Sequence, residues 1–133
     1  GKKLLKVDEK YYVTDHGFRQ AQGFSNTKDI ERTLENIVYV ELASRGYAVK
    51  IGKVKDREID FIAQKGDSVA YYQVSYLLTD EQTREREFGV YGLIEDNFPK
   101  YVLSMDRFDF SRDGIIHKNI IDFLLEDTGA FVR

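Results

Sequence analysis

Residues 57–76, REIDFIAQKGDSVAYYQVSY, are the part of the sequence that most narrows the choice of folds. Two runs rich in β-branched and aromatic residues are joined by a short polar turn around Gly66, a pattern typical of paired strands. A polar residue stands inside each run, Asp60 in the first and Gln73 in the second. For Asp60 two interpretations are open: a carboxylate satisfied by backbone N–H groups or by an arginine such as Arg57, or part of a functional site.

Further elements surround this pair. Residues 29–47 have apolar side chains at helical spacing, with Asn26 or Thr27 as the N-cap and Gly46 as the stop, and predict a helix. A strand over 47–54 precedes the pair, so that three strands form an antiparallel meander. We also expect strands within 3–13, a short helix over 14–22, an amphipathic helix over 79–97 capped by Thr79, a strand over 100–105, and a last strand running into a short helix over 114–127.

The order of these elements predicts an α/β (α+β) domain with helices packed on a mixed sheet. The chain has 133 residues and 42% hydrophobic content, enough for one core, and it contains no linker-like tract. We therefore expect a single domain over residues 1–133. Strict alternation along the first strand of the opening pair places Asp60 and Ile62 on one face, and Ile59 and Phe61 on the other.

Composition excludes several classes of function. The chain has no cysteine, and His16 and His117 do not have the spacing of a zinc site, so we expect both to be surface residues. The net charge of -3 provides no large basic field for nucleic acid. No apolar run approaches the roughly 20 residues of a membrane span, and no signal peptide is evident, which favours a cytoplasmic protein without membrane contact. The start at Gly1 without Met suggests a piece of a larger parent.

Three segments in sequence order resemble a known family. LENIVYVELASRGYAVKIG, REIDFIA and YYQVSY are similar to the helix acid, the E-I/V-D-F strand and the E/Q-x-K strand of PD-(D/E)XK nucleases. Nearly the whole chain, including EKYYVTDHGFR and KYVLSMDRF, resembles the C-terminal domain of unknown function attached to prokaryotic AAA+ ATPases. This resemblance implies a restriction-endonuclease-like mixed sheet flanked by helices, with a AAA+ ATPase domain upstream in the same protein.

The resemblance assigns roles residue by residue. Glu35 matches the helix acid, Asp60 the central metal-binding aspartate and Gln73 the second ligand, so that these three residues are the candidate Mg²⁺ ligands. Ser75 occupies the position of the catalytic lysine, which activates the attacking water and stabilises the transition state. A neutral hydroxyl does neither well, and glutamine in place of glutamate removes a negative charge from the site. We expect Glu35, Asp60 and Gln73 to converge beside Ser75, with no lysine ammonium nearby.

A cation from elsewhere in the chain would change this interpretation. Lys53, Arg57 and Arg84 are the candidates, and their spacing selects none of them. The segment TREREF, residues 83–88, is most simply a solvated helix face. No GxxxxGK[ST] loop occurs, so an ATP site is not expected in this chain.

These observations predict a nuclease-like accessory domain of a AAA+ ATPase with a degenerate active site. It would act as a nucleic-acid-binding, partner-binding or regulatory module. The first alternative is an active Mg²⁺-dependent DNA or RNA nuclease. The second is a structural oligomerisation domain whose carboxylates no longer have a catalytic role.

Overall fold

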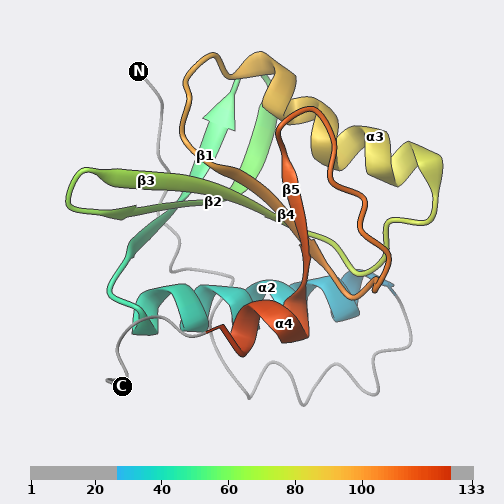
Figure 1. The fold of residues 1–133 in the computed structure, drawn as a ribbon, viewed down its shortest axis with the longest axis horizontal. Helices are drawn as coiled ribbons and strands as arrows, with labels where there is room; N and C mark the ends of the chain where they lie inside the picture. The colour runs from blue at the N-terminus through green and yellow to red at the C-terminus, as the bar shows by residue number, and fades with distance from the viewer. Residues whose placement is uncertain (1–26, 127–133) are drawn as a thin grey trace.

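A computed structural model describes residues 27–126 and contains one five-stranded mixed sheet with three α-helices (Figure 1). The expected strands within 3–13 and the helix over 14–22 lie outside the described residues. The elements are α2 (Thr27–Ser44), β1 (Ala48–Val54), β2 (Arg57–Lys65), β3 (Ser68–Val74), α3 (Glu81–Gly89), the 3₁₀ helix η1 (Val90–Leu93), β4 (Lys100–Ser104), β5 (Ile116–Asn119) and α4 (Ile120–Leu124).

The strands are arranged in sequence order across the sheet. β1, β2 and β3 form the expected antiparallel meander, and β4 and β5 continue the sheet in parallel. The connection from β3 to β4 carries α3 and η1, because a parallel neighbour requires a crossover. The predicted α/β class is therefore confirmed, with a mixed sheet.

Helices cover both faces of the sheet (Figure 1). α2 and α4 pack on one face, where Leu42 and Phe123 meet Phe61 and Leu103. α3 and η1 lie on the other face, where a second cluster forms around Phe88. Each face thus has a core of its own.

The second predicted helix differs from the structure at both ends. Its N-cap is Asp80 rather than Thr79, because the Asp80 side chain accepts a hydrogen bond from the Thr83 N–H. The α-helix ends at Gly89, and the chain continues as η1 to Leu93, four residues short of the predicted end. The region between η1 and β4 is a loop instead of a helical turn, and it becomes the wall of a cleft described below.

β2 contains an extra residue relative to β1. From Lys50 to Gly52 the first strand advances two residues, whereas their partners Ile62 and Ile59 are three residues apart. The bulge moves Ile59 to the α3 side of the sheet with Ile62, while Phe61 packs beneath α2. The expectation that Ile59 and Phe61 share a face is wrong, because a bulge interrupts the period of two.

Among residues 27–126, no helix is both long and apolar enough to cross a membrane.

Candidate functional site

The candidate site lies where β2 and β3 separate. Their last paired residues at this end are Phe61 and Tyr72, and side chains then replace the backbone ladder. The Gln73 Oε1 accepts a hydrogen bond of 2.9 Å from the Asp60 N–H, and the Asp60 Oδ2 accepts one of 2.8 Å from the Val74 N–H. Asp60 and Gln73 therefore meet across the two strands, and both satisfy backbone groups that a regular sheet would pair.

Glu87 contacts this pair from α3, on the face of the sheet that α3 covers. The Gln73 Nε2 donates to the Glu87 Oε1 at 3.1 Å and to the Glu87 carbonyl oxygen at 3.3 Å. The side chain of Glu87 is only 13% exposed. The interpretation of residues 83–88 as a solvated helix face is wrong at this position, because the segment turns one carboxyl towards the strands.

Glu35 approaches the same place from α2, on the opposite side of the sheet. Burial, and after it the nearby charges of Asp60, Glu31 and Glu87, together raise the pKa of Glu35 from 4.5 to about 8. Arg32 acts in the opposite direction and does not offset the burial. The carboxyls of Glu31, Glu35, Asp60 and Glu87 are called the acidic cluster below.

Glu35, Asp60 and Glu87 of the acidic cluster have pKa values raised towards neutral pH. The pKa of Asp60 is raised to about 7, mainly by burial, although the hydrogen bond from the Val74 N–H lowers it. The pKa of Glu87 is raised to about 8, first by burial and then by the charge of Asp60. Carboxyls crowded in this way cannot all ionise, because each charge opposes the next. The site can bind or release protons between about pH 7 and 8.

Ser75 lies beside the acidic cluster and is fully buried. Its hydroxyl donates to the Glu31 Oε2 at 3.3 Å, and the Leu77 carbonyl oxygen, 3.4 Å away, is the alternative acceptor for the same proton. The Tyr76 N–H donates to the same Glu31 oxygen at 3.1 Å. Glu31 was not predicted as a site residue, although it precedes Glu35 by four positions and so lies on the same face of α2.

None of the candidate cations forms an ion pair with the acidic cluster in the part of the chain that the structure describes. Arg57 donates to the Arg86 carbonyl oxygen and lowers the pKa of Glu87 only as a minor cause. Arg84 donates to the carbonyl oxygens of residues 78 and 79. Lys53 lines a separate cavity of about 330 Å³. A cation does approach, since the Arg86 guanidinium lies 3.8 Å from the Glu87 carboxylate.

The candidate ligands do not fit a divalent cation as they are placed. Within the described residues, no three side chains of His, Cys, Asp or Glu are arranged to hold one ion. The Gln73 Oε1 and the Asp60 Oδ2 already accept backbone hydrogen bonds, and the raised pKa values favour protonated carboxyls. Mg²⁺ requires several oxygen ligands and anionic compensation. Mg²⁺ binding by Glu35, Asp60 and Gln73 stays a prediction, and no chemical step is derived from it.

A second buried polar network lies at the ends of β4 and β5. Ser104 Oγ lies 2.8 Å from His117 Nε2 and donates to the Asp106 Oδ2 at 2.7 Å. His117 is 7% exposed, so the expectation of a surface histidine is wrong. The Phe110 N–H donates to the His117 Nδ1, which places the proton of the neutral ring on Nε2. In this tautomer His117 donates to Ser104 and cannot take its proton, so the network connects loops rather than activating a nucleophile.

Comparisons with known proteins give one informative match. No family model and no solved structure matches the chain. An uncharacterized protein of Haemophilus influenzae is 36% identical over 127 residues, which are 95% of this chain. The chain spans 31% of that protein's length. Because that protein is uncharacterized, the match assigns no activity to this chain. It indicates that related sequence occurs within a longer protein.

Proposed function

We propose that the chain is a nuclease-like accessory domain with a degenerate site, which acts as a binding or regulatory module of a AAA+ ATPase. The observation that carries this proposal is the contact between Ser75 and Glu31. A hydroxyl donates to a carboxyl where the resembling family has a lysine ammonium. The site therefore has a hydrogen-bond donor at that position but no positive charge.

The arrangement of the site supports the nuclease-like part of the proposal. A helix acid, a strand aspartate and a glutamine on the neighbouring strand meet at one end of a mixed sheet. The resemblance to PD-(D/E)XK nucleases has the same three positions in the same order. The longer Haemophilus protein is compatible with an ATPase elsewhere in the parent of this domain.

The chemistry of the acidic cluster supports binding rather than cleavage. Phosphodiester cleavage requires an activated water and positive charge against the developing negative charge of the phosphoryl group. Here the Gln73 oxygen is bound to the Asp60 N–H, and burial together with the neighbouring carboxyls raises the pKa of Glu35 to about 8 and that of Asp60 to about 7. Ionising them to bind a metal would cost the free energy of deprotonation in a buried place.

The absence of cleavage is tested on the wild-type chain and on two variants. Plasmid DNA and single-stranded DNA and RNA are incubated with Mg²⁺ or Mn²⁺, and we expect no cleavage. Ser75→Lys should also fail to cleave, because the ligand positions are altered as well. Cleavage by the wild type that Asp60→Ala abolishes would overturn the proposal in favour of an active nuclease. Cleavage that survives Asp60→Ala would come from a contaminating enzyme.

The regulatory part has its own test. In the full-length parent, the ATPase rate is compared between wild type and Asp60→Asn, with Glu95→Gln as an exposed control that also removes one charge. We expect the rate to respond to Asp60→Asn and not to the control. Equal rates in all three proteins would contradict a regulatory role of the site.

A further inference from the structure

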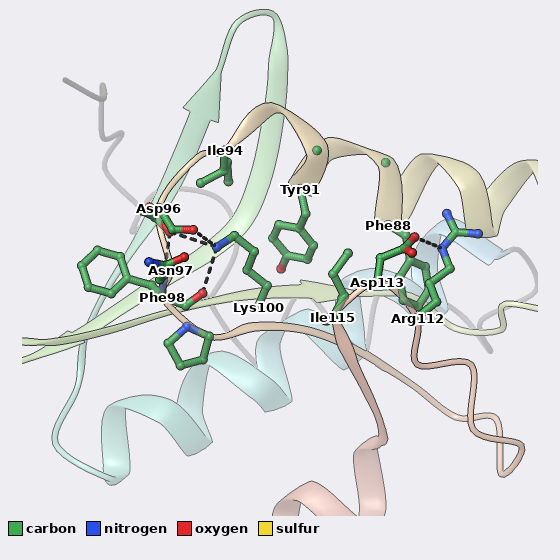
Figure 2. Close-up of a pocket in the computed structure, with 14 residues that line it drawn as sticks. Phe88, Tyr91, Ile94, Asp96, Asn97, Phe98, Lys100, Arg112, Asp113 and Ile115 are labelled. Carbon is green, nitrogen blue, oxygen red and sulfur yellow. Dashed lines mark hydrogen bonds and ion pairs between the residues drawn. The ribbon is translucent and has the colours of Figure 1, made fainter.

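The loop that follows η1 forms one wall of a cleft of about 480 Å³ on the α3 side of the sheet (Figure 2). Phe88 and Tyr91 line this cleft, but both side chains are buried and belong to the core beneath it. Its margin carries charges of both signs, including the ion pair of Lys100 with Asp96. Such a lining favours no single class of occupant. The helices on the opposite face of the sheet present a more uniform surface.

The side of α2 that does not face the sheet is called its outer face and is formed by Thr33, Asn36, Ile37 and Val40. A helix turns by about 100° per residue, so these positions lie on a different side from the buried Leu34, Val38 and Leu42. Val40 is 56% exposed and Ile37 is 38% exposed. None of the four side chains of the outer face is charged. A helix side that faces only water is usually charged or polar, so this one is suited to a contact.

Asn36 adds a polar requirement to the outer face of α2. Its Oδ1 is buried and has no hydrogen-bond partner among residues 27–126. The neighbouring Thr33 hydroxyl does not supply one, because it donates to the Asp29 carbonyl oxygen at 3.0 Å. Buried amide oxygens nearly always accept a hydrogen bond. The occupant of this face should therefore combine apolar side chains with at least one N–H or O–H donor.

The 26 residues that precede α2 have the length to reach this face. The sequence predicts a helix over 14–22, and only the four residues 23–26 separate it from Thr27. Two helices joined by so short a connection pack as antiparallel neighbours. A helix of nine residues is about 13 Å long, so its first turn would lie beside Asn36, which is nine residues into α2.

The same segment has the chemistry that the outer face of α2 requires. The first turn of a helix has N–H groups without partners inside the helix, and here they would face the Asn36 Oδ1. Residues 11–13, Tyr-Tyr-Val, come directly before this turn and supply apolar side chains. In extended form they add about 10 Å, so that residues 11–22 span the roughly 20 Å from Thr27 to Val40.

We propose that residues 11–22 of this chain fold back along α2 and cover its outer face. A second copy of the chain fits less well, because a stable interface takes about 20–30 residues from each partner and this face exposes two large apolar side chains. The segment is also tethered to α2, which gives it a high effective concentration. The contact places the residues that lead into the domain against the helix that carries Glu31 and Glu35. It does not depend on the proposed function, so either proposal can fail without the other.

Nuclear Overhauser effects in the full chain test the contact directly. With ¹³C-labelled isoleucine and valine methyl groups, we expect the methyls of Ile37 and Val40 to show effects to aromatic ring protons within residues 11–22. Absence of such effects, or effects to residues 127–133 instead, would overturn the proposal. In a sample that mixes labelled and unlabelled chains, isotope-filtered effects from these methyls would overturn it in favour of a second copy.

A pair of engineered cysteines gives an independent test, because the chain has no cysteine of its own. Thr14→Cys combined with Asn36→Cys should form a disulfide within one chain under mild oxidation. We expect it to form at least fivefold faster than in the control, Thr14→Cys combined with Lys28→Cys, which lies at the exposed start of α2. Equal rates for the two pairs would contradict the proposal. Thermal unfolding of the reduced variants shows whether they fold, and the methyl measurements on the wild type decide if Asn36→Cys does not.

Discussion

The carboxamide of Gln73 accepts a hydrogen bond from the backbone N–H of Asp60 at 2.9 Å, at the point where their two strands cease to pair. In return the Asp60 carboxyl accepts from the N–H of Val74, the residue after Gln73. The two side chains thus complete a sheet that the backbone leaves open. Because Gln73 also donates to Glu87, it joins the strands to α3 as well.

Gln73→Glu should destabilise the fold. The change removes the donor to Glu87 and adds a carboxyl to a place that already holds several. We expect the free energy of unfolding to fall by about 1–3 kcal/mol, the typical cost of an unsatisfied buried polar group, and to fall more at pH 8.5 than at pH 5.5. Urea denaturation measures this. Gln64→Glu, an exposed position on β2, is the matched control and should have little effect.

The raised pKa values of Glu35 and Asp60 should make stability depend on pH. The ordinary pKa values of Glu35 and Asp60 are 4.5 and 3.8, and burial raises them to about 8 and about 7. Between these limits the folded state binds more protons than the unfolded state, so the free energy of unfolding should fall as pH rises from about 4 to about 8. One retained proton corresponds to about 1.4 kcal/mol per pH unit. Urea midpoints at pH 5.5, 7.0 and 8.5 measure the slope.

Asp60→Asn should flatten this slope and stabilise the protein at pH 8.5. The amide oxygen can still accept from the Val74 N–H, while the charge that opposes Glu35 is gone. Asp60→Ala should instead cost about 1–3 kcal/mol at every pH, because it leaves the Val74 N–H without this acceptor. Glu95→Gln, in an exposed loop, is the charge-matched control. Equal slopes for wild type and Asp60→Asn would show that Asp60 does not retain a proton.

His117 should titrate below the usual pKa of 6.5 and, in its neutral form, carry its proton on Nε2. Burial lowers its pKa below the usual 6.5, and its Nδ1 accepts from the Phe110 N–H. Long-range ¹H–¹⁵N spectra report the tautomer, and His16→Gln assigns the signals. A proton on Nδ1 would refute the proposed direction of the hydrogen bond to Ser104.

Loss of the Ser104 hydroxyl should weaken the fold. Ser104→Ala leaves the His117 Nε2–H without its acceptor and removes a donor to Asp106. We expect a loss of about 1–3 kcal/mol in the free energy of unfolding. Ser68→Ala, at an exposed position, is the matched control. An equal effect of the two substitutions in urea denaturation would contradict the role given to this network.

Local patterns predicted most of the fold. The apolar spacing of α2 and the turns of the meander are short-range signals, and the structure contains both elements. The bulge in β2 was missed because it arises from the pairing of β2 with β1. The alternation of residues along one strand does not reveal that pairing. The prediction that His117 of β5 lies at the surface was wrong for another reason. Ile116 of this strand is exposed and His117 is buried, because β5 lies at the edge of the sheet and turns residues 117 and 119 inward, where hydrogen bonds with Ser104 and Phe110 satisfy the buried imidazole.

The candidate site was predicted in part. Family resemblance led to Glu35, Asp60, Gln73 and Ser75. A hydrogen bond joins Asp60 to Gln73, Glu35 lies close enough for the charge of Asp60 to raise its pKa, and Ser75 contacts the neighbouring Glu31. Their roles in catalysis or metal binding stay predictions. Glu87 was missed because its inward position depends on how α3 crosses the opening between β2 and β3, which no spacing in the sequence records.

The junction of β2 and β3 has a consequence for how related sequences are interpreted. Asp60 and Gln73 finish the sheet with their own side chains, so selection for folding alone is enough to preserve both residues. Their retention in a homologue is then no sign that the homologue cuts nucleic acid. The residue at the position of Ser75 is more informative, because the hydrogen bonds between the two strands do not use its side chain.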